Sequence, residues 1–155
     1  MKANNLALIT NFYKSFSNRD VDGMINCYHK DVTFEDPAFG KLTDGNPAKM
    51  WKMLLSRMNK DATIVYSNIE ATDDTAKANW TATYEFGPKK RKVINNVTAN
   101  FTFKDGKIIE HIDTFDVWSW SKQALGFSGT LLGWSSFMKK KIQKTTNEQL
   151  NNFNL

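Results

Sequence analysis

The chain has very little cysteine or histidine. The 155 residues include one cysteine, Cys27, and two histidines. A single cysteine excludes an internal disulfide and favours a reducing compartment, so we expect a cytoplasmic protein. Cysteine and histidine do not cluster at the spacing that a structural zinc site requires. The sequence therefore calls for neither a metal nor an organic cofactor.

The chain also lacks long apolar runs. No stretch approaches the roughly 20 apolar residues that a membrane-spanning helix needs. The beginning, MKANNLALITNFYKSF, has charged and polar residues throughout and no small-residue cleavage site, so no signal peptide is expected. The net charge is +5, but the basic residues are scattered or lie near the ends and form no face interleaved with aromatic residues. We therefore expect no nucleic-acid partner.

Aromatic residues, in contrast, are plentiful, with 11 Phe, 5 Trp and 4 Tyr. One domain of this length can bury most of its apolar surface, and this composition suits a core together with an apolar cavity. Apolar residues recur at helical spacing in three early segments, and alternation with polar residues follows. Helices followed by an antiparallel meander predict an α+β fold with the sheet wrapped around the helices. The predicted strands cover residues 30–36, 62–71, 76–86, 93–103 and 107 to about 118.

The segment KDVTFEDPAFG, residues 30–40, is the most informative part of the chain. In a strand, Val32, Phe34 and Asp36 share one face, so an acid points the same way as two apolar side chains. Burying this acid is costly unless it is paired, protonated or at work. Pro37 ends the strand directly after it. Two interpretations carry equal weight: Asp36 is a general base beside a hydrophobic interior, or it caps the following loop and faces water.

The last predicted strand places Ile109, His111, Asp113 and Phe115 on one face. Two ionisable groups among apolar ones are typical of a pocket lining. His111 and Asp113 are about 7 Å apart along the strand. This separation suits two side chains that contact one ligand better than two that bond to each other. His111 alone is more often a satisfied core histidine. If His111 and Asp113 converge with Asp36, function is the better interpretation, and these three are the predicted catalytic residues.

The order of elements and the segments YHKDVTFEDPAFG and GKIIEHIDTFD resemble the nuclear transport factor 2-like superfamily, over roughly residues 4–118. This group includes SnoaL-like polyketide cyclases, ketosteroid isomerases and limonene epoxide hydrolases. The resemblance implies a cone of curved sheet and three helices with an apolar pocket, often dimeric through the outer sheet face. Asp36 matches the aspartate that serves the isomerases as general base. The pocket-facing positions of their last strand correspond to His111, Asp113 and Phe115.

The chain departs from some members of this group. The oxyanion tyrosine of the isomerases falls on Phe12, with Tyr13 one step around the helix, and their protonated oxyanion aspartate falls near Ala99. The chain therefore lacks the two hydrogen-bond donors that stabilise the dienolate in the steroid isomerases. The epoxide hydrolases need an Arg-x-Asp pair on a central strand, and residues 92–103 contain none, which excludes that chemistry. The cyclases use an acidic residue over the pocket, and Asp36 or Asp113 could serve.

We interpret the chain as a small-molecule-binding protein for which two functions remain open. One is a cofactor-free isomerase or polyketide cyclase-like enzyme that transfers a proton on an apolar, carbonyl-bearing substrate. The other is a non-catalytic carrier of lipid-like ligands or a protein-interaction module on the same fold. The predicted ligand-binding residues are all aromatic: Phe12, Tyr13, Phe34, Trp51, Trp80, Tyr84 and Phe115.

The outer face of the predicted sheet is polar but weakly charged, and such a face favours a homodimer. Its residues are Thr81, Thr83, Asn96, Thr98, Asn100 and Thr102. We therefore expect two copies of the chain to associate through the sheet.

Residues 119–155 form a predicted C-terminal helical extension of the same domain, which otherwise covers residues 1–118. Leu131, Trp134, Met138 and Ile142 make a helical stripe, and the basic run 139–144 overlaps its end. We rank packing against the cone or a lid over the pocket first, and a membrane-surface helix last. The Asn-rich tail from residue 145 is expected to fray.

Overall fold

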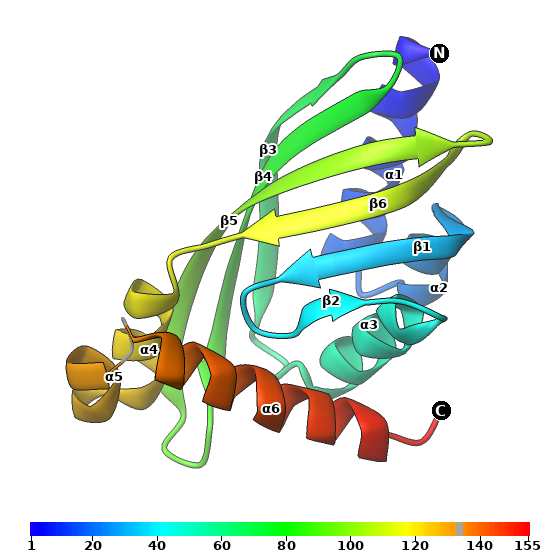
Figure 1. The fold of residues 1–155 in the computed structure, drawn as a ribbon. Coiled ribbons are helices and arrows are strands. Elements are labelled where there is room, and N and C mark those ends of the chain that lie inside the picture. The colour runs from blue at the N-terminus through cyan, green and yellow to red at the C-terminus, as the bar shows by residue number, and fades with distance from the viewer. Residues whose placement is uncertain (133–134) are drawn as a thin grey trace.

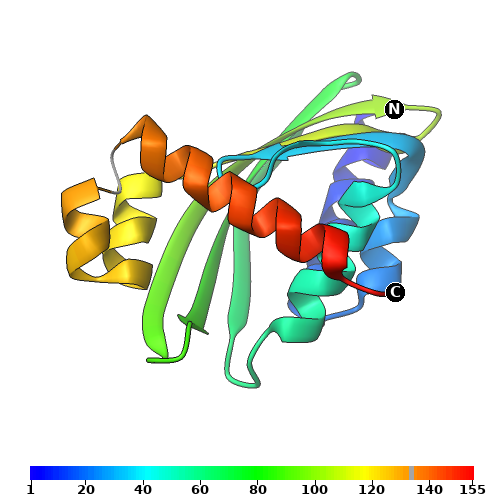
Figure 2. The same ribbon diagram turned by 60° about the horizontal axis from the view of Figure 1, so that its bottom comes forward.

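The protein is a curved sheet wrapped around helices, with further helices at one end (Figures 1 and 2). The computed structural model describes residues 1–132 and 135–155. Its elements are α1 (Lys2–Ser17), α2 (Val21–Asn26), β1 (Tyr28–Asp36), β2 (Gly40–Leu42), α3 (Asn46–Arg57), β3 (Thr63–Ala71), β4 (Thr75–Phe86), β5 (Arg91–Lys104), β6 (Lys107–Thr114), α4 (Val117–Leu125), α5 (Phe127–Leu132) and α6 (Ser136–Asn152). The predicted α+β cone with a C-terminal helical extension is confirmed.

The N-terminal helices turn their apolar stripes toward the sheet. In α1, Ile9, Phe12, Tyr13 and Phe16 are buried, at the spacing of three to four residues that places side chains on one helix face. Asp20 caps α2, because its carboxylate accepts a hydrogen bond from a backbone N–H in the first turn. These helices fill the inside of the curved sheet, so the core lies between the two layers.

The six strands are ordered β2-β1-β6-β5-β4-β3. Strands β3 to β6 form the predicted antiparallel meander. Its last turn contains Asp105 and Gly106, with φ values of 52° and 73°, as a type I′ hairpin turn requires at both positions. β1 pairs with β6 in parallel, so the prediction of a wholly antiparallel sheet was wrong for this pair. The helices before β1 deliver it to the end where β6 begins, and there Ile108 N–H donates to the Cys27 carbonyl.

The C-terminal segment differs from the sequence prediction in two respects. The last strand ends at Thr114 instead of near residue 118, because the Asp116 carboxylate caps α4. The tail does not fray at residue 145: α6 continues to Asn152, and Leu150 is only 1% exposed. In the predicted stripe, Met138 is buried, whereas Trp134 lies outside the described residues.

Helix α6 is tied to the β1–β2 turn. The backbone carbonyls of residues 37–39 accept hydrogen bonds from the side chains of Gln143, Thr146 and Asn147, at 3.1, 2.6 and 2.8 Å respectively. Figure 2 shows the helix crossing in front of the open end of the sheet. Among the described residues, no helix combines the length and apolar character needed to cross a membrane.

Candidate functional site

A cavity of about 800 Å³ occupies the open end of the cone, within the usual size range of small-molecule sites. The inner face of the sheet forms one wall, and α3, α4, α5 and α6 supply the others. The lining is largely apolar, with the carboxylates of Asp36 and Asp113 among its polar groups. The predicted site residues that line it are Phe34, Asp36, Trp51, Trp80, Tyr84, Asp113 and Phe115.

Three predicted site residues lie behind this wall. Phe12, Tyr13 and His111 are 0% exposed, and the cavity lining does not include them. The structure therefore does not place these three residues at the cavity surface, because other aromatic rings surround them. The His111 ring centroid lies 4.4 Å from that of Phe101 and 5.0 Å from that of Phe34. The predicted convergence of three residues therefore reduces to two carboxylates at the cavity wall.

Asp36 both caps a loop and lines the cavity, so capping does not exclude a place on the cavity wall. Its Oδ1 atom accepts hydrogen bonds from the backbone N–H groups of Ala38 and Phe39, at 2.9 and 2.6 Å. Burial raises the pKa of Asp36 from its ordinary 3.8 to about 7. The Phe39 N–H opposes this shift, and the negative charge of Asp113 adds to it. A carboxyl group with such a pKa can accept and return a proton near neutral pH.

Tyr84 adds a hydroxyl group to the same wall. Its oxygen accepts a hydrogen bond of 2.7 Å from Trp120 Nε1. Burial raises the pKa of Tyr84 despite this bond, and the charge of Asp36 raises it further. The hydroxyl therefore keeps a proton that it can donate within electrostatic reach of Asp36. The sequence assigned Tyr84 only an apolar role, since no local pattern shows that Trp120 of the C-terminal extension would orient it.

Asp113 is held by a chain of hydrogen bonds that runs through the core. Trp51 Nε1 donates to Tyr28 Oη at 2.7 Å, Tyr28 pairs with His111 Nδ1 at 2.8 Å, and His111 Nε2 pairs with Asp113 Oδ1 at 2.9 Å. An indole N–H can only donate. If His111 is neutral with its proton on Nε2, every donor in the chain has an acceptor. Trp80 Nε1 makes a longer contact of 3.4 Å to the same carboxylate oxygen.

The direct bond between His111 and Asp113 corrects the prediction that their side chains lie about 7 Å apart along the strand. Their backbone positions are two residues apart on one face, but both side chains lean toward each other and bond directly. His111 thus has the role of a satisfied core histidine that also orients an acid at the cavity wall. Tyr28, which sequence reasoning missed, links it to α3. The only sequence signal for Tyr28 was its place in an apolar stripe.

Replacing His111 should be more damaging than replacing Tyr28. His111→Phe leaves the buried Asp113 carboxylate and the Tyr28 hydroxyl without their partner, which should lower the free energy of unfolding by about 3 kcal/mol. Tyr28→Phe removes a neutral link in the middle of the chain, so Trp51 Nε1 loses its acceptor and His111 Nδ1 loses its partner. This variant should cost about 2 kcal/mol, because no charged group is left unpaired. Urea unfolding at neutral pH measures both. Equal losses in the two variants would contradict a central role for the His111–Asp113 bond.

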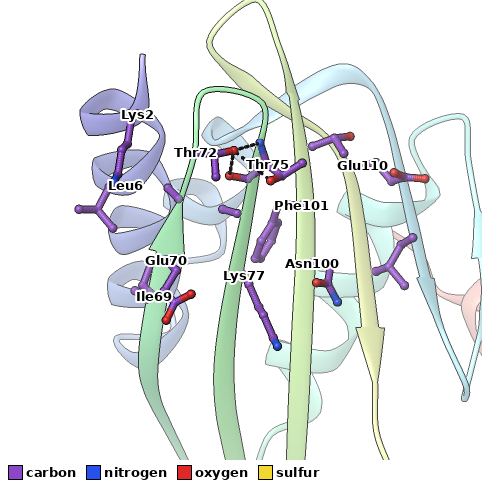
Figure 3. A pocket seen from close by; sticks show the side chains of 14 residues that line it. Lys2, Leu6, Ile69, Glu70, Thr72, Thr75, Lys77, Asn100, Phe101 and Glu110 are labelled. Atoms are coloured by element: carbon purple, nitrogen blue, oxygen red, sulfur yellow. Dashed lines mark hydrogen bonds between the residues drawn. The ribbon is translucent and has the colours of Figure 1, made fainter.

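A second hollow, of about 730 Å³, lies where the start of α1 meets the β3–β4 turn and the outer sheet face (Figure 3). Its rim carries charges of both signs, from Lys2, Glu70, Lys77 and Glu110. Hydrogen bonds between Thr72 and Thr75 close one edge. It shares no residue with the lining of the first cavity, and we place the candidate site in the first.

Within residues 1–132 and 135–155, no three potential metal-ligating His, Cys, Asp or Glu side chains come together.

The architecture and the site together define a cone with an acid-bearing apolar cavity. The chain belongs to the SnoaL-like domain family, whose model matches residues 9–111. This membership confirms the superfamily that the sequence resembled. No curated protein matches the chain significantly.

Several solved structures share the fold. TerC, co-crystallised with polyporic acid, is 17% identical with a TM-score of 0.66, covering 77% of this chain and 97% of its own. A putative polyketide cyclase from Xanthomonas campestris pv. campestris is 17% identical with a TM-score of 0.64, covering 79% and 97%. A limonene epoxide hydrolase-like enzyme of Mycobacterium tuberculosis is 22% identical with a TM-score of 0.62, covering 84% and 96%. At these identities the likeness shows the fold alone.

Proposed function

We propose that the cavity binds an apolar small molecule bearing a carbonyl group and that Asp36 transfers a proton on it. The observation that carries this proposal is a carboxyl group with a pKa of about 7 on the wall of a largely apolar cavity of about 800 Å³. General bases work best when their pKa lies near the working pH. Such a pKa on a cavity wall is a recognised mark of functional sites.

The reaction begins when the Asp36 carboxylate removes a proton from the carbon next to the carbonyl group. The electron pair of the broken C–H bond moves toward the carbonyl oxygen, which gives an enolate and a protonated Asp36. The Tyr84 hydroxyl donates a hydrogen bond to that oxygen, and Trp120 orients the hydroxyl. In a ligand with a C=C bond next to the deprotonated carbon, the enolate is conjugated, and Asp36 returns the proton to the far end of that bond, which completes an isomerisation. In a ligand with a second carbonyl group, the enolate carbon attacks that carbonyl carbon, and Asp36 returns the proton to the resulting alkoxide oxygen, which completes a cyclisation.

Asp113 supplies a second polar contact in this scheme. His111 holds one of its oxygens, and the carboxylate accepts a hydrogen bond from a hydroxyl group of the ligand. Two of the structurally similar proteins fit this chemistry: one is a putative polyketide cyclase, and another was crystallised with polyporic acid. A polyketide-like or aromatic ligand with several oxygen atoms matches a wall of aromatic rings and two carboxylates.

Titration of the Asp36 carboxyl group tests the general base directly. Carbon-detected NMR of the intact protein should give a pKa near 7, and Asp113→Asn should lower it because one of the charges that raises it is removed. An ordinary aspartate pKa for Asp36 would remove it as the base. The carrier function would then be favoured, and mass spectrometry of a co-purified ligand would identify the cargo.

We also propose that the protein forms a homodimer through the outer sheet face. The face carries Asn96 and Asn100, both exposed, beside partly buried threonines, and weakly charged surfaces pair more readily than Lys/Glu-rich ones. Light scattering at micromolar concentration should give twice the 17.8 kDa mass of one chain. A monomer mass would count against this interface.

A further inference from the structure

Two segments of this chain carry basic residues and no acidic ones. Residues 87–92 and 117–147 together contain nine Lys and Arg and no Asp or Glu. The rest of the chain has twelve basic residues against all 16 acidic ones, so it is net negative. All nine side chains are exposed. They are Lys89, Lys90, Arg91, Lys92, Lys122, Lys139, Lys140, Lys141 and Lys144.

The fold brings these two segments to one end of the molecule. Arg91 Nε donates a hydrogen bond of 2.8 Å to the Gln123 carbonyl, and the Gln123 side chain accepts one of 2.8 Å from Ile94 N–H. The start of β5, next to the β4–β5 turn, therefore lies against α4. Figures 1 and 2 both show this turn, α4, α5 and the first turns of α6 at the same end. We call the residues 87–92, 117–131 and 136–144 the basic end.

Large apolar side chains are exposed on the same basic end. Phe127 at the start of α5 is 80% exposed, and Phe137 at the start of α6 is 68% exposed. Trp118 is 43% exposed, and Lys122 Nζ lies 4.1 Å from the centre of its ring. Two acidic residues lie at the border of this end: Glu85 is opposite Lys92 in the sheet, and Asp116 caps α4. The basic residues outnumber them, and exposed rings gathered among mainly positive charge mark an interaction surface.

We infer that the basic end docks on the surface of an anionic lipid bilayer. A bilayer offers the two features that this end complements, a plane of negative phosphate groups and an apolar layer just below it. Clusters of four to eight Lys and Arg on a surface helix bind anionic lipids in this way. Phenylalanine rings gain most from the apolar layer, because they have no polar atom to satisfy. Sequence analysis ranked a membrane-surface role last, because the sequence alone does not show that Phe127 and Phe137 are exposed or that the two basic segments are adjacent.

The cavity lies next to the same end, because residues of α4, α5 and α6 line it. Met138, Lys141 and Ile142 of α6 line the cavity, while Phe137 and Lys139 of the same helix are exposed. Docking through α5 and α6 would therefore place the cavity next to the bilayer surface. The docking inference stands whether or not Asp36 is a base, since neither charge nor exposure at the basic end depends on the cavity.

Vesicle co-sedimentation of the full chain tests the inference. Binding should be strong to phosphatidylcholine vesicles containing about 30% phosphatidylserine at about 0.15 M ionic strength, and weak to phosphatidylcholine alone. The triple variant Lys139→Gln, Lys140→Gln, Lys144→Gln should bind about 100-fold more weakly. Phe127→Ser combined with Phe137→Ser should weaken binding about tenfold. Every replaced side chain is exposed, and an unchanged melting temperature confirms that the variants fold.

A matched control separates the basic end from net charge. Lys14→Gln, Lys77→Gln, Lys104→Gln removes the same charge from exposed positions on other elements and should leave binding within about twofold. Equal weakening by the control, or binding that survives the phenylalanine replacements, would overturn the inference. Failure to bind anionic vesicles would also overturn it, and tight binding of single-stranded RNA in their place would assign the surface to nucleic acid.

Discussion

Replacing Asp36 with asparagine should stabilise the protein by on the order of 4 kcal/mol at about pH 8 and leave its stability nearly unchanged at about pH 4. Burial raises the pKa of Asp36 from 3.8 to about 7. Between these values the folded state keeps a proton that the unfolded chain has released. The free energy of unfolding of the wild type therefore falls as the pH rises through this window and levels off above it.

The asparagine variant avoids this loss because it is neutral at every pH. Its side-chain oxygen can still accept the hydrogen bonds from residues 38 and 39 that the carboxylate accepts now. Urea unfolding at several pH values measures the difference between the two proteins. Asp61→Asn, at an exposed loop position, is the matched control and should shift stability by less than about 0.5 kcal/mol. Parallel pH profiles for the wild type and Asp36→Asn would show that Asp36 ionises as readily when folded as when unfolded.

The same replacement should abolish most of the activity on a true substrate. If Asp36 transfers the proton, Asp36→Asn should lower kcat by about 10³-fold, because general acid–base catalysis typically contributes about 10²–10⁴-fold. Ligand affinity should remain within about threefold, since the cavity keeps its shape. Thermal-shift screening of sterols, polyketide fragments and fatty acids supplies the ligand, and initial rates with equilibrium binding then separate the two quantities.

Two further variants complete this experiment. Trp80→Ala should weaken binding about tenfold or more by removing an aromatic wall, and Tyr84→Phe should lower kcat by about 10²-fold by removing a donor to the developing oxyanion. Turnover of Asp36→Asn at the wild-type rate would end the general-base hypothesis. If Trp80→Ala alone had an effect, through binding, the protein would be a carrier.

Strand alternation predicted that Asp36 shares a face with Val32 and Phe34, and Pro37 predicted that the strand ends there, but neither decided between a cavity-lining acid and a loop cap. The sequence also predicted Asp113, Trp80 and Phe115 on the cavity side from the same period of two. Alternation assigns a face but not a rotamer, which is why the direct bond between His111 and Asp113 could not be predicted. It also cannot tell a cavity-lining position from one covered by a neighbouring ring.

The sequence also could not predict which distant segments pack against one another. The parallel pairing of β1 with β6 depends on how two helices steer the chain, and no pattern within either strand encodes its direction. The helical stripe near residue 138 identified an apolar helix face but not its partner. The structure shows that Met138 and Ile142 meet the cavity and that Trp120 meets Tyr84. A stripe of apolar residues can bury itself against any complementary surface, so only the assembled fold selects one.

The β1–β2 turn couples the protonation of Asp36 to the packing of α6. Its N–H groups bind Asp36, and its carbonyl groups bind α6. Departure of α6 would admit water to the cavity, and because burial is the largest cause of the raised pKa, the proton on Asp36 would then be held less tightly. Linkage makes the effect reciprocal: loss of the proton favours departure of the helix by the same factor. If α6 leaves the cavity, ionisation of Asp36 therefore favours the open form over the closed one.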